Sequence, residues 1–382
     1  ATPTSGGSIT VNATGNTSKG FELNASGLVA YGPISVTATG TADHAFNMYG
    51  TGAKVQSASG ITINGTGSIG LSLYNNAIIQ STGGNIGITA NGLYNGVYMD
   101  TTGGILASND TAAPTTATPT SGGSLTINAT ATSSGQGVLI YNGSLISYGA
   151  MSLTSRGVAA NQGLYVAGTG AFKSVGALTI DASTTGASWG MQLESSRVIQ
   201  STAGNVSVTG VGDYGVYMNG SIVASNDTAN PTTATPTSGG TLTINATGRT
   251  NYGLQIGAGS LVSHGAITVN GTGYLESLYV NGVEIKVDFA LDEPGVDRRA
   301  KVVTAINERF GQHGVKAVDN GKGIDLSSDG RNLSVWFDSN VEGLSPASFG
   351  LDQGGAVAQV SKMKIDGTVA IGDDFKIGRA HV

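Results

Sequence analysis

Residues 61–64 read Ile-Thr-Ile-Asn, and residues 125–128 read Leu-Thr-Ile-Asn. The core of this stretch is a triplet of two apolar residues around a small, mostly polar one. The triplet recurs ten times at steps of 25 to 28 residues, apart from two longer steps of 39 and 36. Such alternation is typical of a β-strand with one buried side. The triplets are Ile9-Thr10-Val11, Ile34-Ser35-Val36, Ile61-Thr62-Ile63, Ile86-Gly87-Ile88, Leu125-Thr126-Ile127, Met151-Ser152-Leu153, Leu178-Thr179-Ile180, Val206-Ser207-Val208, Leu242-Thr243-Ile244 and Ile267-Thr268-Val269.

Two further short strands follow each triplet. The second comes after a glycine, as in Gly96-Val97-Tyr98-Met99, and the third resembles Ile105-Leu106-Ala107-Ser108. Three short strands per repeat, separated by Gly, Asn and Ser corners, are typical of one turn of a β-solenoid. One turn cannot bury its own apolar side, so stacked turns supply the core. The sequence therefore predicts a mainly β chain: a right-handed parallel β-solenoid of about ten turns, followed by a small α+β module.

A longer repeat spans several of these turns. The heptapeptide Ala-Thr-Pro-Thr-Ser-Gly-Gly occupies residues 1–7, 117–123 and 234–240, so four-turn repeats begin near residues 1, 117 and 234. Before the second and third copies stand the related stretches 109–116 and 226–233, each with a proline. Because proline cannot donate to a strand ladder, each stretch is expected to loop out at a corner after every fourth turn. Near-identical copies indicate duplication within a longer array.

Charge divides the chain into two parts. Residues 1–281 hold six Lys/Arg and nine Asp/Glu, whereas residues 282–382 hold twelve and fifteen. This predicts a solenoid stalk over 1–281 and a separate module from 282. The 382 residues contain no cysteine, which excludes a disulfide framework and a Cys-ligated metal. The net charge of −6 gives no sign of a nucleic-acid partner, and no apolar run is long enough to span a membrane.

The stalk's acidic residues argue against an active site. Glycoside or metal-assisted hydrolysis needs clustered carboxylates, and these residues fall in different turns. Asp43 and His44 are adjacent, and a solvated corner is the preferred interpretation of that pair. The sequence thus predicts no catalytic residue, no metal and no cofactor. The acids are Glu22, Asp43, Asp100, Asp110, Asp181, Glu194, Asp213, Asp227 and Glu276.

The outward middle position of the second strands is the best candidate for ligand contact. Four tyrosines in this column would lie on one face and offer platforms for sugars. The alternative is that tyrosine merely suits an exposed strand position and packs along its ladder. The candidate ligand-contact residues are Tyr98, Tyr165, Tyr217 and Tyr279.

Asparagine follows the first strand in five turns, each time within an Asn-x-Ser/Thr triplet. The triplet matches the acceptor sequence for N-glycosylation. A structural interpretation is favoured, in which asparagine adopts left-handed turn geometry at a corner. The residues are Asn12, Asn64, Asn128, Asn245 and Asn270.

The pattern changes after residue 280. Residues 280–287 are expected to form a strand, and Pro294 and Asp297 mark the start of a helix that Gly311 ends. Further strands are expected over 315–318, 323–326 and 333–337, giving a β-α-β-β-β module.

This module resembles the IN motif of flagellins and flagellar hook-associated proteins over about residues 280–337. The resemblance implies an outward-facing region without catalytic residues. Residues 338–375 are expected to form a trailing, truncated β segment, and residues 376–382 resemble a translated sequencing adapter. The matching stretches are Asn281-Gly282-Val283, Ala305-Ile306-Asn307, Gly314-Val315-Lys316-Ala317 and Leu326-Ser327-Ser328-Asp329-Gly330-Arg331-Asn332.

The repeat region, over residues 8–280, is similar to the β-helical stalks of filamentous-haemagglutinin-like bacterial adhesins. Together the two resemblances imply a non-enzymatic structural or adhesive fragment of a large bacterial cell-surface or extracellular filament protein. The expected partners are glycans, host or cell surfaces, or neighbouring filament subunits. Two alternatives stay open: the variable outer region of a giant flagellin or hook-associated protein, and a β-helix polysaccharide lyase or hydrolase.

Overall fold

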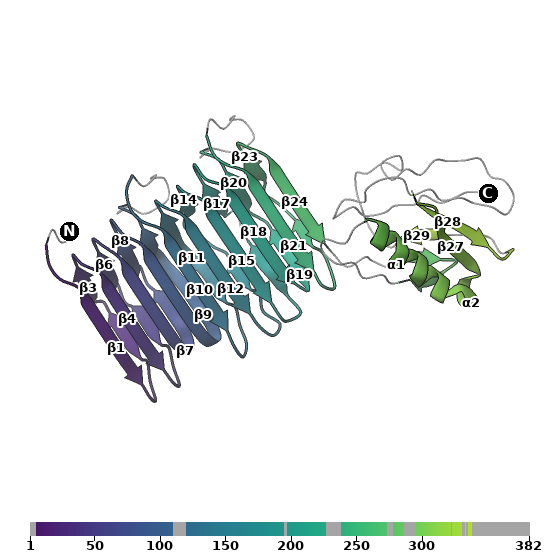
Figure 1. The fold of residues 1–382 in the computed structure, drawn as a ribbon. Coiled ribbons are helices and arrows are strands. Elements are labelled where there is room, and N and C mark those ends of the chain that lie inside the picture. Colours follow the sequence, from purple (N-terminus) through teal and green to yellow (C-terminus); the bar gives the residue numbers. More distant parts are fainter. Residues whose placement is uncertain are drawn as a thin grey trace. The chain divides into compact units, whose positions relative to one another are not determined.

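The repeats form the expected parallel β-solenoid (Figure 1). The structure, a computed structural model, describes residues 5–109, 120–194, 197–226, 238–272, 278–285, 295–321, 323–330, 333 and 335–337. The chain divides into two compact units, Ala1–Gly271 and Thr272–Val382. The trailing segment at 338–375 and the tail at 376–382 lie outside the described residues.

The first strands of the turns stack in parallel (Figure 1). Ten of them define about nine complete turns. They are β1 (Ile9–Gly15), β4 (Ile34–Gly40), the first parts of β7 (Ile61–Tyr74) and β9 (Ile86–Ala107), β10 (Leu125–Ala131), β12 (Met151–Gly157), β15 (Leu178–Thr184), β18 (Val206–Gly212), β21 (Leu242–Gly248) and β24 (Ile267–Thr272).

The second and third strands form their own parallel stacks. The second stack contains β2 (Phe21–Asn24), β5 (Phe46–Tyr49), parts of β7 and β9, the first part of β11 (Val138–Ser147), β13 (Leu164–Val166), β16 (Trp189–Leu193), β19 (Tyr214–Met218) and β22 (Leu254–Ile256). The third contains β3 (Gly27–Ala30), β6 (Lys54–Ser57), β8 (Ile78–Ser81), the last parts of β9 and β11, β14 (Phe172–Ser174), β17 (Val198–Ser201), β20 (Ser221–Ala224) and β23 (Leu261–Ser263).

Alternation along each strand separates the core from the surface. In β7, Ile61 and Ile63 are buried, whereas Thr62 and Asn64 are exposed. The register places residues of the same kind opposite one another: Ile61 pairs with Ile34 in one neighbouring turn and with Ile86 in the other. Apolar side chains from successive turns therefore form one continuous column. Burying that column and closing the ladder hydrogen bonds stabilise every turn through its neighbours.

The two excursions leave the solenoid at equivalent corners, between a third strand and the next first strand. Isolated bridges close them at Ser108–Gly122 and at Ser225–Gly239. Four first strands precede the first excursion, and four more separate it from the second. The flanks of both stretches therefore lie at the corner where a loop is expected, and the loops themselves stay a prediction. The proline-containing stretches themselves lie largely outside the described residues.

The repeated asparagines do not occupy corners, and the expected left-handed geometry is wrong for all five. Asn12, Asn64, Asn128, Asn245 and Asn270 lie within first strands, and none of them has a positive φ. Each stands two residues after the polar centre of its triplet, so period-two alternation points it outward. The repeated asparagine is a surface position of the sheet.

Among its described residues, the second unit contains two small antiparallel sheets and two helices. Strand β25 (Leu278–Val280) pairs with β26 (Val283–Ile285) and β29 (Val335–Phe337). After α1 (Gly295–Glu308) and α2 (Phe310–His313), β27 (Val315–Asp319) pairs with β28 (Ile324–Ser328). A separate core holds this unit together, as expected for an α+β module. It contains Val280, Ile285, Ile306, Val315, Ala317, Ile324 and Leu326.

Two local expectations for this unit are corrected. The strand expected over 280–287 is a hairpin, because Asn281 and Gly282 both have positive φ, 47° and 80°. Asn-Gly is the preferred dipeptide for such a two-residue turn. The helical region also continues past the expected end at Gly311 and ends at Gly314 instead. Gly314 has a φ of 71° and donates its N–H to the Phe310 carbonyl oxygen, which closes the helix.

Candidate functional site

The outer side of the second-strand stack, here called the second-strand face, carries the predicted column in register. Eight successive pairings place its members opposite one another, turn by turn. Tyr279 does not belong to this face, because it lies on β25 in the second unit. The column is Glu22, Asn47, Ser72, Tyr98, Leu139, Tyr165, Gln192, Tyr217 and Gln255.

Two of the predicted tyrosines belong to a larger aromatic row, defined as Tyr74, Tyr98, Tyr141 and Tyr165. Their ring centroids are separated by 5.2 Å, 6.1 Å and 5.8 Å in that order. The tilted and edge-on arrangements are those that aromatic pairs prefer. Leu139 lies between Tyr98 and Tyr165 in register and is only 5% exposed. The row therefore presents a continuous aromatic strip along four turns.

Sequence reasoning missed Tyr74 and Tyr141. Both stand two residues after a member of the predicted column, so alternation sends them to the same side of the sheet. Extending the predicted column by one outward position along each strand would have found them. Tyr141 is the most accessible member of the row, with 43% of its surface exposed.

Burial raises the pKa of three members of the row. Burial, together with the neighbouring Tyr74, Asp100 and Tyr141, raises the pKa of Tyr98 to about 12. Burial and the nearby Asp100 and Asp43 carboxylates raise the pKa of Tyr74. Burial first, and then the Glu194 charge, raise the pKa of Tyr165. All three hydroxyls are therefore neutral at physiological pH and able both to donate and to accept hydrogen bonds.

A second aromatic cluster lies farther along the same face. The ring centroid of Trp189 lies 4.4 Å from that of Tyr214 and 5.1 Å from that of Tyr217, and both ring pairs are tilted. The ring centroid of Tyr252 lies 6.4 Å from that of Tyr214. Trp189 and Tyr214 are register partners in adjacent turns. Tyr217 is thus the third predicted residue on this face, held in a group separate from the aromatic row.

A chain of amides extends over successive turns of the same face. Gln136 Nε2 donates to Gln162 Oε1 (3.0 Å), and Gln162 Nε2 donates to Gln192 Oε1 (2.6 Å). Gln192 Nε2 then donates to Glu194 Oε1 (2.6 Å), while Asn219 Nδ2 donates to Glu194 Oε2 (3.0 Å). Three of these four bonds cross from one turn to the next, so the polar groups are held in fixed positions.

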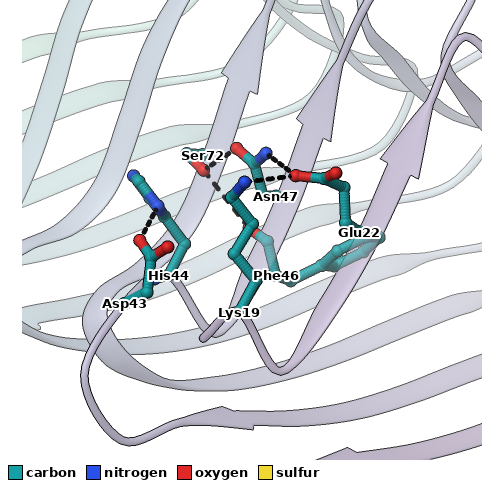
Figure 2. A network of polar contacts seen from close by, with 7 residues as sticks. All are labelled: Lys19, Glu22, Asp43, His44, Phe46, Asn47 and Ser72. Carbon is teal, nitrogen blue, oxygen red and sulfur yellow. Dashed lines mark hydrogen bonds and ion pairs between the residues drawn. The ribbon is translucent and has the colours of Figure 1, made fainter. Parts of the chain in front are cut away.

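Figure 2 shows a third group, at the first turns of the same face. Lys19 Nζ lies 2.6 Å from Glu22 Oε2, and Asn47 Nδ2 donates to the same oxygen at 2.8 Å. These two contacts lower the pKa of Glu22, and the hydrogen bond to Glu22 raises that of Lys19. Ser72 Oγ donates to Asn47 Oδ1 at 2.7 Å. The group joins three turns through side chains alone.

Asp43 and His44 form a closer pair than a solvated corner requires (Figure 2). His44 Nδ1 lies 2.6 Å from Asp43 Oδ1, which also accepts the His44 backbone N–H. Burial opposes the ionisation of Asp43, but the backbone, charge and ring interactions with His44 outweigh it and lower the pKa of Asp43. His44 Nε2 is buried and has no hydrogen-bond partner among the described residues. The Ser72 hydroxyl, drawn in the same view, bonds instead to the Asn47 side chain and to the Phe46 carbonyl oxygen.

No family model, curated protein or solved structure matches this chain significantly. The resemblances to flagellins and to haemagglutinin-like adhesins therefore stay predictions, whereas the β-solenoid is a property of the structure. In the part of the chain that the structure describes, no helix is long and apolar enough to cross a bilayer. Within the same residues, no three His, Asp or Glu side chains cluster as metal ligands.

Proposed function

We propose that this chain is a non-enzymatic, adhesive stalk segment of a bacterial surface or extracellular filament protein, and that its second-strand face binds neutral glycans. The aromatic row on a register-locked scaffold is the observation that supports the proposal. Tyrosine combines a flat apolar ring with a polar hydroxyl, which suits the mixed apolar and hydroxyl faces of a sugar. The solenoid spaces such rings at roughly 4.8 Å per turn, so an extended glycan meets one turn after another.

The charge next to the row favours a neutral ligand over a polyanion. Asp100 and Glu194 are the charged residues that influence Tyr98 and Tyr165. Nucleic acids and acidic polysaccharides are bound mainly through Lys and Arg. The nearby amides of Gln162 and Gln192 supply hydrogen bonds suited to sugar hydroxyls.

A binding assay with the full chain tests this function. Neutral and acidic glycans are immobilised, and retention of the chain is compared with that of two variants. Tyr141→Ala removes the most exposed ring of the row, whereas Tyr148→Ala removes a ring of similar exposure, 40%, outside the row. We expect neutral glycans to retain the native chain and the Tyr148 variant but not the Tyr141 variant. Equal retention of both variants, or no retention of the native chain, would refute glycan binding by the row.

The second candidate function, the outer region of a flagellar subunit, is supported by the second unit. Its helices and β-hairpins lie in the stretch, about residues 280–337, that resembles the IN motif. Immunogold labelling of cells that produce the protein separates the two candidates. Label along flagellar filaments supports the subunit, and label on the cell envelope supports the adhesin.

A further inference from the structure

The outer side of the first-strand stack, here called the first-strand face, has a different chemistry. Over the first five turns its outward residues are uncharged and carry small polar side chains, apart from one glycine. All are partly or fully exposed. We name this set the hydroxyl array: Thr10, Asn12, Thr14, Ser35, Thr37, Thr39, Thr62, Asn64, Thr66, Gly87, Thr89, Asn91, Thr126, Asn128 and Thr130.

The hydroxyl array repeats regularly in two directions. Four successive pairings match its strands residue by residue, without a register shift between array members. Neighbouring turns are roughly 4.8 Å apart, and outward neighbours on one strand are about 6.7 Å apart. In Figure 1 these strands lie side by side. Beyond the fifth turn the pattern is interrupted by Arg156, Asp181 and Val211, the first two of which form an ion pair.

Such a surface suits a partner that is itself periodic. The array has no aromatic or charged member. Aromatic and charged side chains are the groups through which most protein partners and soluble ligands are bound. Threonine is stiff at χ1, so each hydroxyl and methyl group is held with little loss of entropy on binding. The array therefore offers fixed hydrogen-bonding groups at lattice spacing, separated by small apolar methyl groups.

We propose that the hydroxyl array binds ice. The surface of an ice crystal is an uncharged, two-dimensional lattice of water oxygens, with repeats of the same order as the spacings between turns and along strands. Hydroxyl and amide groups at regular positions order water into that lattice, and the threonine methyl groups cover the spaces between. A crystalline polysaccharide exposes apolar ring faces, which aromatic side chains bind best. The aromatic row of this molecule lies on the second-strand face instead.

Slow growth of ice from a dilute solution of the full chain tests the proposal. The share of protein that enters the ice is compared with that of serum albumin. Thr37→Lys/Thr89→Lys places two long, charged side chains in the middle of the array at exposed positions. Val29→Lys/Val198→Lys makes the same change at exposed positions of third strands, outside both faces. Circular dichroism and thermal unfolding establish that both variants are folded.

We expect ice to enrich the native chain and the control variant, and the array variant to fall to the level of albumin. The proposal is overturned if the native chain enters ice no more than albumin does, or if the array variant enters as well as the control. Loss of the array variant's binding to microcrystalline cellulose, with no ice enrichment of the native chain, would assign the array to a polysaccharide lattice instead. The result is independent of glycan binding, which the Tyr141→Ala variant reports separately.

Discussion

The first-strand and second-strand faces share one backbone and one core, yet they differ in almost every outward side chain. Over five turns the first-strand face repeats small uncharged polar groups, whereas the second-strand face changes from Glu22 through Ser72 to Tyr98. Inward positions are apolar beneath both. Stacking therefore fixes the inward residues alone and leaves each outward column free to acquire its own chemistry.

The largest expected effect tests the inward side of this comparison. Val97 is fully buried, so Val97→Asp would place an unpaired charge in the apolar column. We expect a loss of more than about 4 kcal/mol in the free energy of unfolding, measured by chemical denaturation. The neighbouring Tyr98→Ser should cost far less, about 1 kcal/mol, from lost ring contacts. Equal losses would contradict the assignment of inside and outside.

Substitution of two glycines, Gly186 at a corner and Gly87 on the first-strand face, compares how closely the backbone is packed at the two places. A Cβ added at Gly186 would lie 1.1 Å from the Ala159 carbonyl oxygen, whereas at Gly87 it would meet nothing within 4 Å. We expect Gly186→Ala to destabilise the chain by about 2 kcal/mol, because the turns would have to separate. Gly87→Ala, on the first-strand face, should stay within about 0.5 kcal/mol of the native chain. Thermal unfolding measures both, and a tolerated Gly186→Ala would argue against such close stacking.

The buried Arg197 lies directly before β17, at the corner that follows β16. Arg197 is 3% exposed, and its Nη2 donates a hydrogen bond to the Gly143 carbonyl oxygen at 3.1 Å. Its Nε and Nη1 have no partner among the described residues, and burial lowers its pKa to about 10. Because a buried cation without a counter-ion is costly, Arg197→Met should stabilise the chain by about 1 kcal/mol. A lower midpoint of urea unfolding for the variant would show that the guanidinium is stabilising.

The smallest expected effect concerns pH. The pKa of Tyr98 is raised to about 12 in the folded chain, above the ordinary tyrosine pKa of about 10. The stability that this shift contributes is therefore complete below pH 10 and is lost as the pH rises from 10 towards 12. Tyrosinate absorbance should include a late-titrating component that Tyr98→Phe removes. An unchanged titration curve in the variant would contradict burial of the Tyr98 hydroxyl.

The solenoid could be predicted because its determinants are local and repeated. A triplet such as Ile61-Thr62-Ile63 fixes the inward side, and its recurrence fixes the register. Corners were harder to predict, because a short polar residue suits either a turn or an outward strand position. The five asparagines were misplaced for that reason. The Asn281–Gly282 hairpin was missed although its turn dipeptide is a strong signal.

The candidate site could be predicted only in part. The column containing Tyr98, Tyr165 and Tyr217 follows from alternation, and the same rule extends to Tyr74 and Tyr141. Hydrogen bonds between turns, such as that from Gln162 to Gln192, depend on side-chain conformations that no sequence spacing specifies. Tyr279 fits the alternation but pairs within the second unit, because hairpin formation with β26 prevails over continued stacking.

The central claim is that successive turns stack in the register described, and engineered cysteines test it directly because the native chain has none. Asn64 and Thr89 are register partners in adjacent turns, whereas Asn64 and Asn128 are two turns apart. A disulfide requires Cα atoms within about 7 Å, which only adjacent turns satisfy. Oxidation of Asn64→Cys/Thr89→Cys should give a nearly complete intramolecular disulfide, and Asn64→Cys/Asn128→Cys should give none. Absence of the first disulfide, or equal formation of both, would contradict the stacked solenoid.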